Sequence, residues 1–350
     1  MAVATLTIDL AALVENWRAL DAKSASNVET AAVVKADGYG CDAGRVSAAL
    51  SKAGAKTFFV AAAEEGIAVR KNTPNDTTIY VFSGGCMGDH DILKANNLVP
   101  LLNSPEQVKE YAAEDSPFGI QLDSGMNRLG LEPHEFNALR DQIIAAEPEI
   151  LMSHLACADE PDHPMNTQQR SAFKAMTDGL TIPKSLAATG GTLLGPDYHF
   201  DLTRPGVGLY GGFPFTDAAP VVRVSIPVIQ TRTVEVGEAV GYAAFWQAKR
   251  TSKVATIAAG YADGLIRQMG NHTNDHRVNL FAGDTPCPLI GRVSMDMITV
   301  DITDLDQTPT HLDILCDHQT VDDLADAAGT IGYEILTSLG GRYNRVYEGG

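Results

Sequence analysis

Several features that would assign the chain to a specialised class of protein are missing from its sequence. No stretch of the 350 residues approaches the roughly 20 apolar residues that a transmembrane helix needs. The N-terminus lacks a basic region and a long apolar core, so we expect no signal peptide and a cytoplasmic location. Positive charge is scarce, and the formal charge of -18 argues against binding to nucleic acid, which needs clustered Lys and Arg.

Paired cysteines are missing too. The five cysteines are scattered along the chain, at Cys41, Cys86, Cys157, Cys287 and Cys316, and none belongs to a Cys-x-x-Cys motif. We therefore expect reduced thiols and no zinc site built on paired cysteines. The rest of the composition, 45% hydrophobic and 20% charged, is that of an ordinary globular protein.

The first stretch with a possible catalytic role is an apolar run that ends in a lysine. A buried strand over residues 31–35 would deliver Lys35 to the C-terminal end of the strand, where the chain turns through Gly38 and Gly40. A lysine whose pKa is lowered by desolvation can form an imine with a carbonyl cofactor. On this stretch alone, a lysine that caps a strand in solvent is an equally good interpretation.

Short apolar runs then alternate with amphipathic helical stretches. The predicted strands are residues 31–35, 57–61, 78–82, 98–102, 118–122, 150–154, 184–188 and 200–204, and helices between them include residues 43–52, 62–71, 105–113 and 134–146. Eight strands alternating with helices indicate a (β/α)8 barrel. A doubly wound sheet is the alternative, although no Gly-x-Gly-x-x-Gly motif follows the first strand.

The pattern changes near residue 220, where short alternating strands predict a mostly antiparallel β domain. A single late helix is predicted over residues 321–339. We therefore expect a barrel over residues 1–220 and a β domain over residues 221–350. The first strand, residues 4–8, is a candidate for pairing with the second domain.

Barrel enzymes carry their chemistry at the C-terminal ends of the strands. The residues at these ends are Lys35, Asp123 followed by Arg128, His154, Thr189 with Gly190-Gly191, and Arg204. Such a set of cations and hydrogen-bond donors suits an anionic ligand. Taken singly, His154 could be a core histidine, and Arg128 could form an ion pair with Asp123.

These residues lie in motifs that resemble those of the alanine racemases. The motifs are AVVKADGYG at residues 32–40, LDSGMNRLG at 122–130, SHLA at 153–156 with ADE at 158–160, RPGVGLYG at 204–211, GYADG at 260–264 and GRVSMD at 291–296. They follow the order of the family and cover essentially the whole chain.

The resemblance implies an enzyme that interconverts L- and D-alanine for peptidoglycan precursors. It implies pyridoxal 5'-phosphate bound in the barrel and a head-to-tail homodimer with shared active sites. Lys35 would carry the cofactor and handle the proton on the D-face of the substrate, and Tyr261 of the partner subunit would handle the proton on the L-face.

The remaining site residues also follow from the resemblance. Arg204 would hydrogen-bond the ring nitrogen of the cofactor and, with His154, form a chain toward Tyr261. Because a guanidinium keeps its protons, Arg204 would limit side reactions such as transamination. The expected phosphate ligands are Tyr39, Thr189 and the backbone near Gly206 and Val207, and the expected ligands of the substrate carboxylate are Arg128 and the Met295 backbone N–H.

The chain departs from the family pattern at a few positions. Gln121 stands where some members have a carbamylated lysine, so we expect a neutral group to position Arg128. Thr189 replaces the more usual serine and keeps the hydroxyl, and Ser294 replaces a cysteine. Gly341 replaces a tyrosine that contacts the phosphate in some relatives, and that contact is expected to be missing.

Other functions fit parts of the sequence. A broad-specificity racemase, or one for serine or lysine, would share the fold. A regulatory protein that binds the same cofactor is disfavoured because such relatives lack the β domain. A metal-dependent lyase would need ligands in the β domain, where Cys316, His311 and His318 form the only loose cluster.

Overall fold

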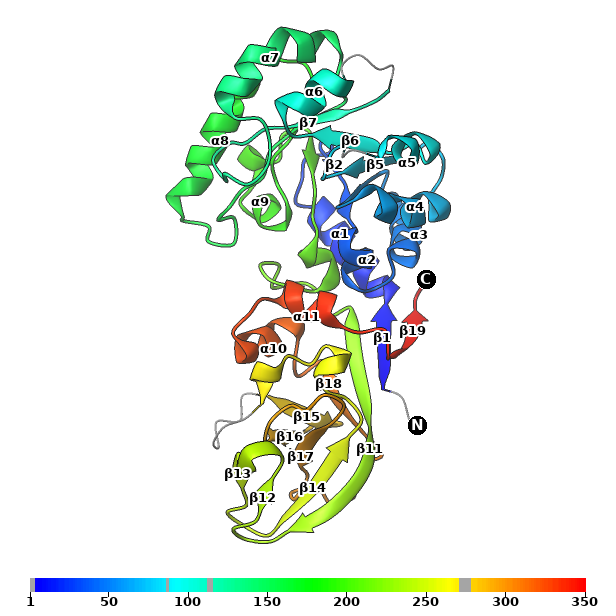
Figure 1. Cartoon of the computed structure of the whole chain (residues 1–350), viewed down its shortest axis with the longest axis vertical. Coiled ribbons are helices and arrows are strands. Elements are labelled where there is room, and N and C mark those ends of the chain that lie inside the picture. Colours follow the sequence, from blue (N-terminus) through cyan, green and yellow to red (C-terminus); the bar gives the residue numbers. More distant parts are fainter. Residues whose placement is uncertain (1–3, 86–87, 112–115, 271–277) are drawn as a thin grey trace. The chain divides into compact units, whose positions relative to one another are not determined.

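The protein is described by a computed structural model that covers residues 4–85, 88–111, 116–270 and 278–350. It divides into two compact units, which Figure 1 shows in the colours of the sequence. The barrel unit comprises Leu13–Leu209 and Pro214–Asp217, and the β unit comprises Met1–Ala12, Tyr210–Phe213 and Ala218–Gly350. Of the five cysteines, Cys86 lies outside the described residues, and the other four form no disulfide.

The barrel unit is built on parallel strands that pair in chain order. They are β3 (Ala32–Val33), β4 (Thr57–Val60), β5 (Thr78–Val81), β6 (Val99–Leu102), β7 (Gly119–Gln121), β8 (Leu151–Met152) and β9 (Lys184–Ser185). β4 and β6 are apolar except for Thr57 of β4, and both strands are buried along their whole length. Burial on both faces is what a parallel sheet covered by helices requires.

The eighth strand closes the ring. β10 (Leu202–Thr203) pairs in parallel with β2 (Glu29–Thr30), and Ala188, just beyond β9, forms a parallel bridge with Arg204. β2 and β3 are two parts of one strand, because the N–H of Ala31 between them donates to the carbonyl of Thr203 at 2.9 Å. The predicted (β/α)8 barrel is thereby confirmed.

Helices lie between the strands of the barrel, and α1 precedes the first of these strands. They are α1 (Leu10–Asp21), α2 (Lys35–Tyr39), α3 (Ala43–Ala53), α4 (Ala63–Asn72), α5 (His90–Ala95), α6 (Pro105–Tyr111), α7 (Pro133–Ala145), α8 (Pro164–Thr177) and α9 (Thr189–Leu193), with 3-10 turns η1 (Pro196–Tyr198) and η2 (Val207–Tyr210). Capping residues bound α3: Asp42 Oδ1 accepts the Arg45 N–H at 3.1 Å, and Gly54 ends the helix with a left-handed φ of 119°. No helix within the described residues is long and apolar enough to span a bilayer.

The β unit contains one mostly antiparallel sheet. Its strands are β1 (Thr5–Asp9), β11 (Val222–Val234), β14 (Ser252–Ile257), β15 (Asn279–Ala282), β16 (Thr285–Ile290), β17 (Ile298–Asp301), β18 (His311–Leu315) and β19 (Asn344–Glu348). β14 pairs with β17 and also with β11, so the strands from β14 to β11 in the sheet order form a closed set. The N-terminal strand β1 pairs with β11 and, in parallel, with β19.

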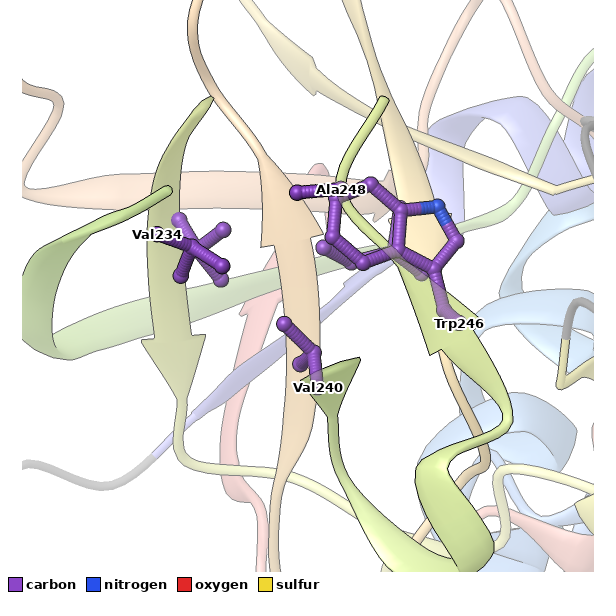
Figure 2. Packing of buried hydrophobic residues seen from close by; sticks show 6 residues of the cluster. Val234, Val240, Trp246 and Ala248 are labelled. Carbon is purple, nitrogen blue, oxygen red and sulfur yellow. The ribbon is translucent and has the colours of Figure 1, made fainter. Parts of the chain in front are cut away.

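A small apolar cluster lies under a short hairpin of this unit. Val234, Val240, Trp246 and Ala248 lie together in Figure 2, and Val254 and Ile290 complete the buried cluster. Val240 and Trp246 come from the short hairpin of β12 (Ala239–Val240) and β13 (Trp246–Gln247). The hairpin therefore covers the sheet with apolar side chains.

The prediction of one helix over residues 321–339 is wrong. The segment forms two helices, α10 (Val321–Ala328) and α11 (Gly332–Ser338). Gly329 adopts a left-handed conformation with φ 69°, and its N–H bonds back to the carbonyls of Ala325 and Asp326. A glycine in this conformation ends a helix, and the apolar pattern on both sides concealed the break.

Candidate active site

Lys35 lies just beyond β3, where the chain makes an unusual turn. Ala36, Asp37, Gly38, Tyr39 and Gly40 all have positive φ, between 53° and 81°. A left-handed conformation costs a non-glycine residue about 1–2 kcal/mol, and three of these five residues are not glycine. The predicted turn through Gly38 and Gly40 is thus a short left-handed helix that other contacts must stabilise.

Two carboxylates hold this turn. Glu65 accepts the Ala36 N–H through Oε1 at 2.8 Å and the Ala61 N–H, at the end of β4, through Oε2 at 2.7 Å. Asp37 Oδ1 accepts the N–H of Ala43 at the start of α3 at 3.0 Å. Sequence reasoning missed Glu65, because an acidic residue in the first turn of a helix is ordinary.

The environment of Lys35 favours its neutral amine. Burial lowers the pKa of Lys35, the nearby charge of Arg128 lowers it further, and Glu65 opposes the shift. The Nζ atom also lies 5.8 Å from the centre of the Phe82 ring. A lysine with a lowered pKa can act as a nucleophile and as a base near neutral pH.

Arg204 is buried in the barrel with 1% of its surface exposed. Its Nη2 donates to the carbonyl of Ser153 at 2.8 Å, and its Nη1 donates to the hydroxyl of Ser185. No carboxylate of the described residues pairs with it. Burial lowers its pKa to about 9, so the guanidinium remains charged at neutral pH and still has N–H donors to offer a ligand.

His154 lies among cations. Burial, followed by the charges of Arg204, Arg128 and Lys35, lowers the pKa of His154 to about 3, so its imidazole is neutral. Gln169 fixes the backbone on both sides of the histidine: Nε2 donates to the His154 carbonyl at 2.9 Å, and Oε1 accepts the Ala156 N–H at 2.8 Å. Gln169 is a second residue that sequence reasoning missed.

The expected phosphate ligands come together at one side of the barrel unit. Thr189 Oγ1 accepts the N–H of Gly206 at 3.0 Å and that of Gly208 at 3.3 Å, so its own proton is directed elsewhere. A Cβ on Gly206 would lie 2.5 Å from the Tyr39 hydroxyl. The Gly206 N–H is therefore committed to Thr189, whereas the Val207 N–H has no acceptor among the described residues.

Arg128 is exposed at the end of a loop whose backbone is held by Asp123 and Gln121. Asp123 Oδ1 accepts the N–H groups of Gly125 and Met126 at 2.7 and 2.9 Å, and within the described chain no ion pair joins Asp123 to Arg128. Gln121 donates to the Leu129 carbonyl at 3.1 Å, and its buried Oε1 has no partner among the described residues. Gln121 thus holds the loop backbone and not the guanidinium.

Tyr261 and Met295 belong to the β unit, where the structure brings them together. Tyr261 opens the 3-10 turn η4 (Tyr261–Asp263), and its N–H donates to the Ser294 carbonyl at 2.9 Å. The Ala262 N–H donates to the Met295 carbonyl at 3.0 Å. Tyr261 and Met295 are 43% and 53% exposed.

The loose cluster of Cys316, His311 and His318 does not form a metal site in the part of the chain that the structure describes. His318 Nε2 lies 2.9 Å from Asp284 Oδ1. No group of three His, Cys, Asp or Glu side chains there could hold a metal ion.

Comparison with known proteins identifies relatives of both halves of the chain. Residues 8–214 match the family described as "Alanine racemase, N-terminal domain", and residues 221–347 match "Alanine racemase, C-terminal domain". The chain is 60% identical over 349 residues to an alanine racemase of Cereibacter sphaeroides, covering 99% of each chain. It is 57% identical over 352 residues to that of Dinoroseobacter shibae, covering 100% of this chain and 99% of the relative.

Solved structures agree with this relationship. The alanine racemase of Bartonella henselae, solved with covalently bound pyridoxal phosphate, has a TM-score of 0.92 at 36% identity and covers 99% of this chain and 100% of its own. The biosynthetic alanine racemase of Pseudomonas aeruginosa has a TM-score of 0.92 at 32% identity, with both chains covered completely. The similarity therefore extends over the barrel and the β unit alike.

Proposed function

The chain belongs to the alanine racemase family, and we propose that it catalyses its reaction with two acid–base groups, Lys35 and Tyr261 of the partner subunit. It is an amino-acid racemase that uses pyridoxal 5'-phosphate and interconverts L- and D-alanine. Each group would serve one face of the substrate Cα, Lys35 the D-face and Tyr261 the L-face. The cofactor, when bound, supplies an electron-withdrawing ring that stabilises negative charge at Cα.

The residues of the barrel unit fit this cofactor. The lowered pKa of Lys35 suits a lysine that binds a carbonyl group. Arg204 would donate to the ring nitrogen. The hydroxyls of Tyr39 and Thr189 and the Val207 N–H would donate to the phosphate. Gly206 has no side chain and so leaves room for the Tyr39 hydroxyl. Donors from hydroxyls and backbone suffice for a phosphate in a site that excludes water.

One observation carries the proposal: a buried, charged Arg204 without a carboxylate partner lies near a neutral His154 and a lysine of lowered pKa. The hydrogen bonds to Ser153 and Ser185 supply no negative charge, so a structural role alone would leave part of the cost of burying this cation without compensation. An electron-rich ring nitrogen and an anionic ligand would provide this compensation.

The substrate carboxylate would be bound by Arg128 and by the backbone N–H of Met295. Met295 and Tyr261 lie in the β unit with exposed side chains, which leaves them open to contact with a second surface. We propose a homodimer with shared active sites, in which each barrel receives these two residues from its partner. We also propose that the enzyme is cytoplasmic and supplies D-alanine for peptidoglycan.

The function is tested by incubating the purified, cofactor-loaded protein with single L-amino acids, including alanine, serine and lysine, and measuring D-product. D-alanine is expected as the main product, and failure to form it would overturn the proposal. Lys35→Ala should abolish the absorption band of the covalently bound cofactor. Mixing inactive Lys35→Ala and Tyr261→Phe proteins should restore partial activity if the sites are shared between subunits.

A further inference from the structure

Three loops of the β unit meet at the guanidinium of Arg342. Its Nε and Nη2 donate to the two carboxylate oxygens of Asp263 at 2.7 and 2.6 Å, and its Nη1 donates to Oδ1 of Asp296 at 2.7 Å. Asp263 closes the turn that begins with Tyr261, and Asp296 follows Met295 in the chain. One side chain from a third loop therefore connects the two loops that present Tyr261 and Met295.

The turn that carries Tyr261 is held by the side chain of Asp263. Asp263 Oδ2 accepts the N–H of Gly260, the residue before Tyr261, at 2.8 Å. Within the described part of the β unit, no group hydrogen-bonds the Tyr261 hydroxyl. The backbone of the turn therefore fixes the point from which the phenol projects, and that backbone depends on the position of the Asp263 carboxylate.

The surrounding backbone is packed closely enough to transmit a change at this carboxylate. Gly264 has a φ of 96°, and a side chain there would collide with the carbonyl of Ser338. Gly340, two residues before Arg342, donates its N–H to the carbonyl of Asp263 at 3.1 Å. The third loop thus contacts the turn both through the backbone and through the guanidinium.

We propose that Arg342 is a positioning residue for the reaction: its paired contacts with Asp263 and Asp296 fix the turn of Tyr261 relative to the loop of Met295. The proposal rests on the proton-transfer role of Tyr261 proposed above. It assigns to Arg342 no contact with substrate or cofactor.

The chemistry of the pair explains why an arginine stands there. A guanidinium can bind one carboxylate through two parallel N–H groups and still donate to a second acceptor, whereas a lysine ammonium provides no such fixed geometry. Arg342 is 50% exposed, whereas Asp263 is only 7% exposed and keeps the Gly260 N–H when the guanidinium is lost. Loss of the clamp should therefore cost some stability through the buried carboxylate as well as disturb position, and the measurements below separate the two effects.

The chain offers a matched control in Arg250. It also binds two aspartates of the β unit, Asp304 through two contacts of 2.7 Å and Asp301 at 3.7 Å, and its side chain is 52% exposed. Arg342→Gln is expected to lower kcat/KM for racemisation by about 10- to 100-fold, the effect of a small misplacement of a reacting group. Arg342→Lys should fall between this variant and wild type, and Arg250→Gln should stay within about twofold of wild type.

Two measurements separate positioning from a general loss of structure. Wash-out of deuterium from the α-position of D-alanine requires the Lys35 face alone, so Arg342→Gln should retain it while racemisation falls. Amide hydrogen exchange, followed by mass spectrometry of the cofactor-loaded enzyme, should accelerate in the peptide that contains residues 260–264. Arg250→Gln should change neither quantity.

Equal racemisation and equal amide exchange in Arg342→Gln and Arg250→Gln would overturn the proposal. If wild type does not racemise alanine, the proposed function fails, whereas amide exchange still tests the clamp. Should Arg342→Gln fail to fold, Asp296→Asn removes only the exposed contact. Asp296→Asn is expected to lower racemisation several-fold and to leave deuterium wash-out from D-alanine intact. Loss of both activities, or of neither, would contradict the clamp.

Discussion

The carboxylate of Glu65 lies 2.8 Å from the backbone N–H of Ala36, although 29 residues separate the two in sequence. Ala36 is the first residue of the left-handed turn and directly follows Lys35. The same carboxylate holds the Ala61 N–H at the end of β4. Glu65 therefore fastens the strained turn to the neighbouring strand and stabilises the conformation in which Lys35 is presented.

Glu65→Ala should destabilise the protein and weaken attachment of the cofactor to Lys35. The loss of two charge-assisted hydrogen bonds predicts a decrease of about 2 kcal/mol in the free energy of unfolding, measured in urea. Glu65→Gln keeps an acceptor for one N–H and should lose less. Glu64→Ala, an exposed neighbour on the same helix, is the control, and equal losses in the two alanine variants would contradict this role.

Much of the fold was predictable because the hydrophobic pattern marks its strands. Each of the eight apolar runs of the barrel contains a strand. The late helix was mispredicted because the apolar residues of α10 and α11 continue one pattern across Gly329. A glycine there is compatible with either outcome until its φ is known.

The candidate site could be predicted only for residues that lie in a recognisable motif. The motifs supplied Lys35 and Tyr261, but not the left-handed turn, since Ala36, Asp37 and Tyr39 have no preference for positive φ. Residues that act through tertiary contacts carry no local signal. Arg342 lies 79 residues from Asp263, and the charges of an exposed loop do not reveal such a pair.

The neutral state of His154 predicts a pH dependence of stability. Its pKa is about 3 in the folded protein, against an ordinary value near 6.5, so between these values the unfolded chain binds more protons. Stability is therefore lost as the pH falls from about 6.5 toward 3, by at most about 1.4 kcal/mol per pH unit. His154→Gln lacks this contribution, and its unfolding free energy, measured without cofactor, should decline less steeply; parallel profiles would contradict the assignment.

Gly206→Ala should weaken cofactor binding, because the added Cβ would lie 2.5 Å from the Tyr39 hydroxyl. Tyr39 would have to move away from the expected phosphate site, and we expect the affinity for pyridoxal 5'-phosphate to fall at least about tenfold, which corresponds to about 1.4 kcal/mol. Absorbance titration measures this. Gly341→Ala, where the added Cβ meets nothing within 4 Å, should bind normally, and equal affinities of the two variants would exclude this role for Gly206.

Replacing Arg204 should alter the outcome of the reaction as well as its rate. A guanidinium donates hydrogen bonds without surrendering its proton, even with its pKa lowered to about 9. A lysine ammonium gives up a proton more readily, so Arg204→Lys should favour protonation of the cofactor ring nitrogen. A protonated ring would withdraw more charge, so the protein would no longer direct the proton back to the substrate Cα as selectively as it does with Arg204.

Arg204→Lys is therefore expected to slow racemisation and to raise the amount of pyruvate formed per racemisation turnover. Arg204→Gln, which has no proton to transfer, should slow racemisation without this increase. Coupled assays of pyruvate and D-alanine on the same samples give the ratio. Because both variants lose the contacts to Ser153 and Ser185, they share the structural disturbance and differ in the transferable proton. An equal rise in pyruvate in both would show that the disturbance, and not the proton, determines reaction specificity.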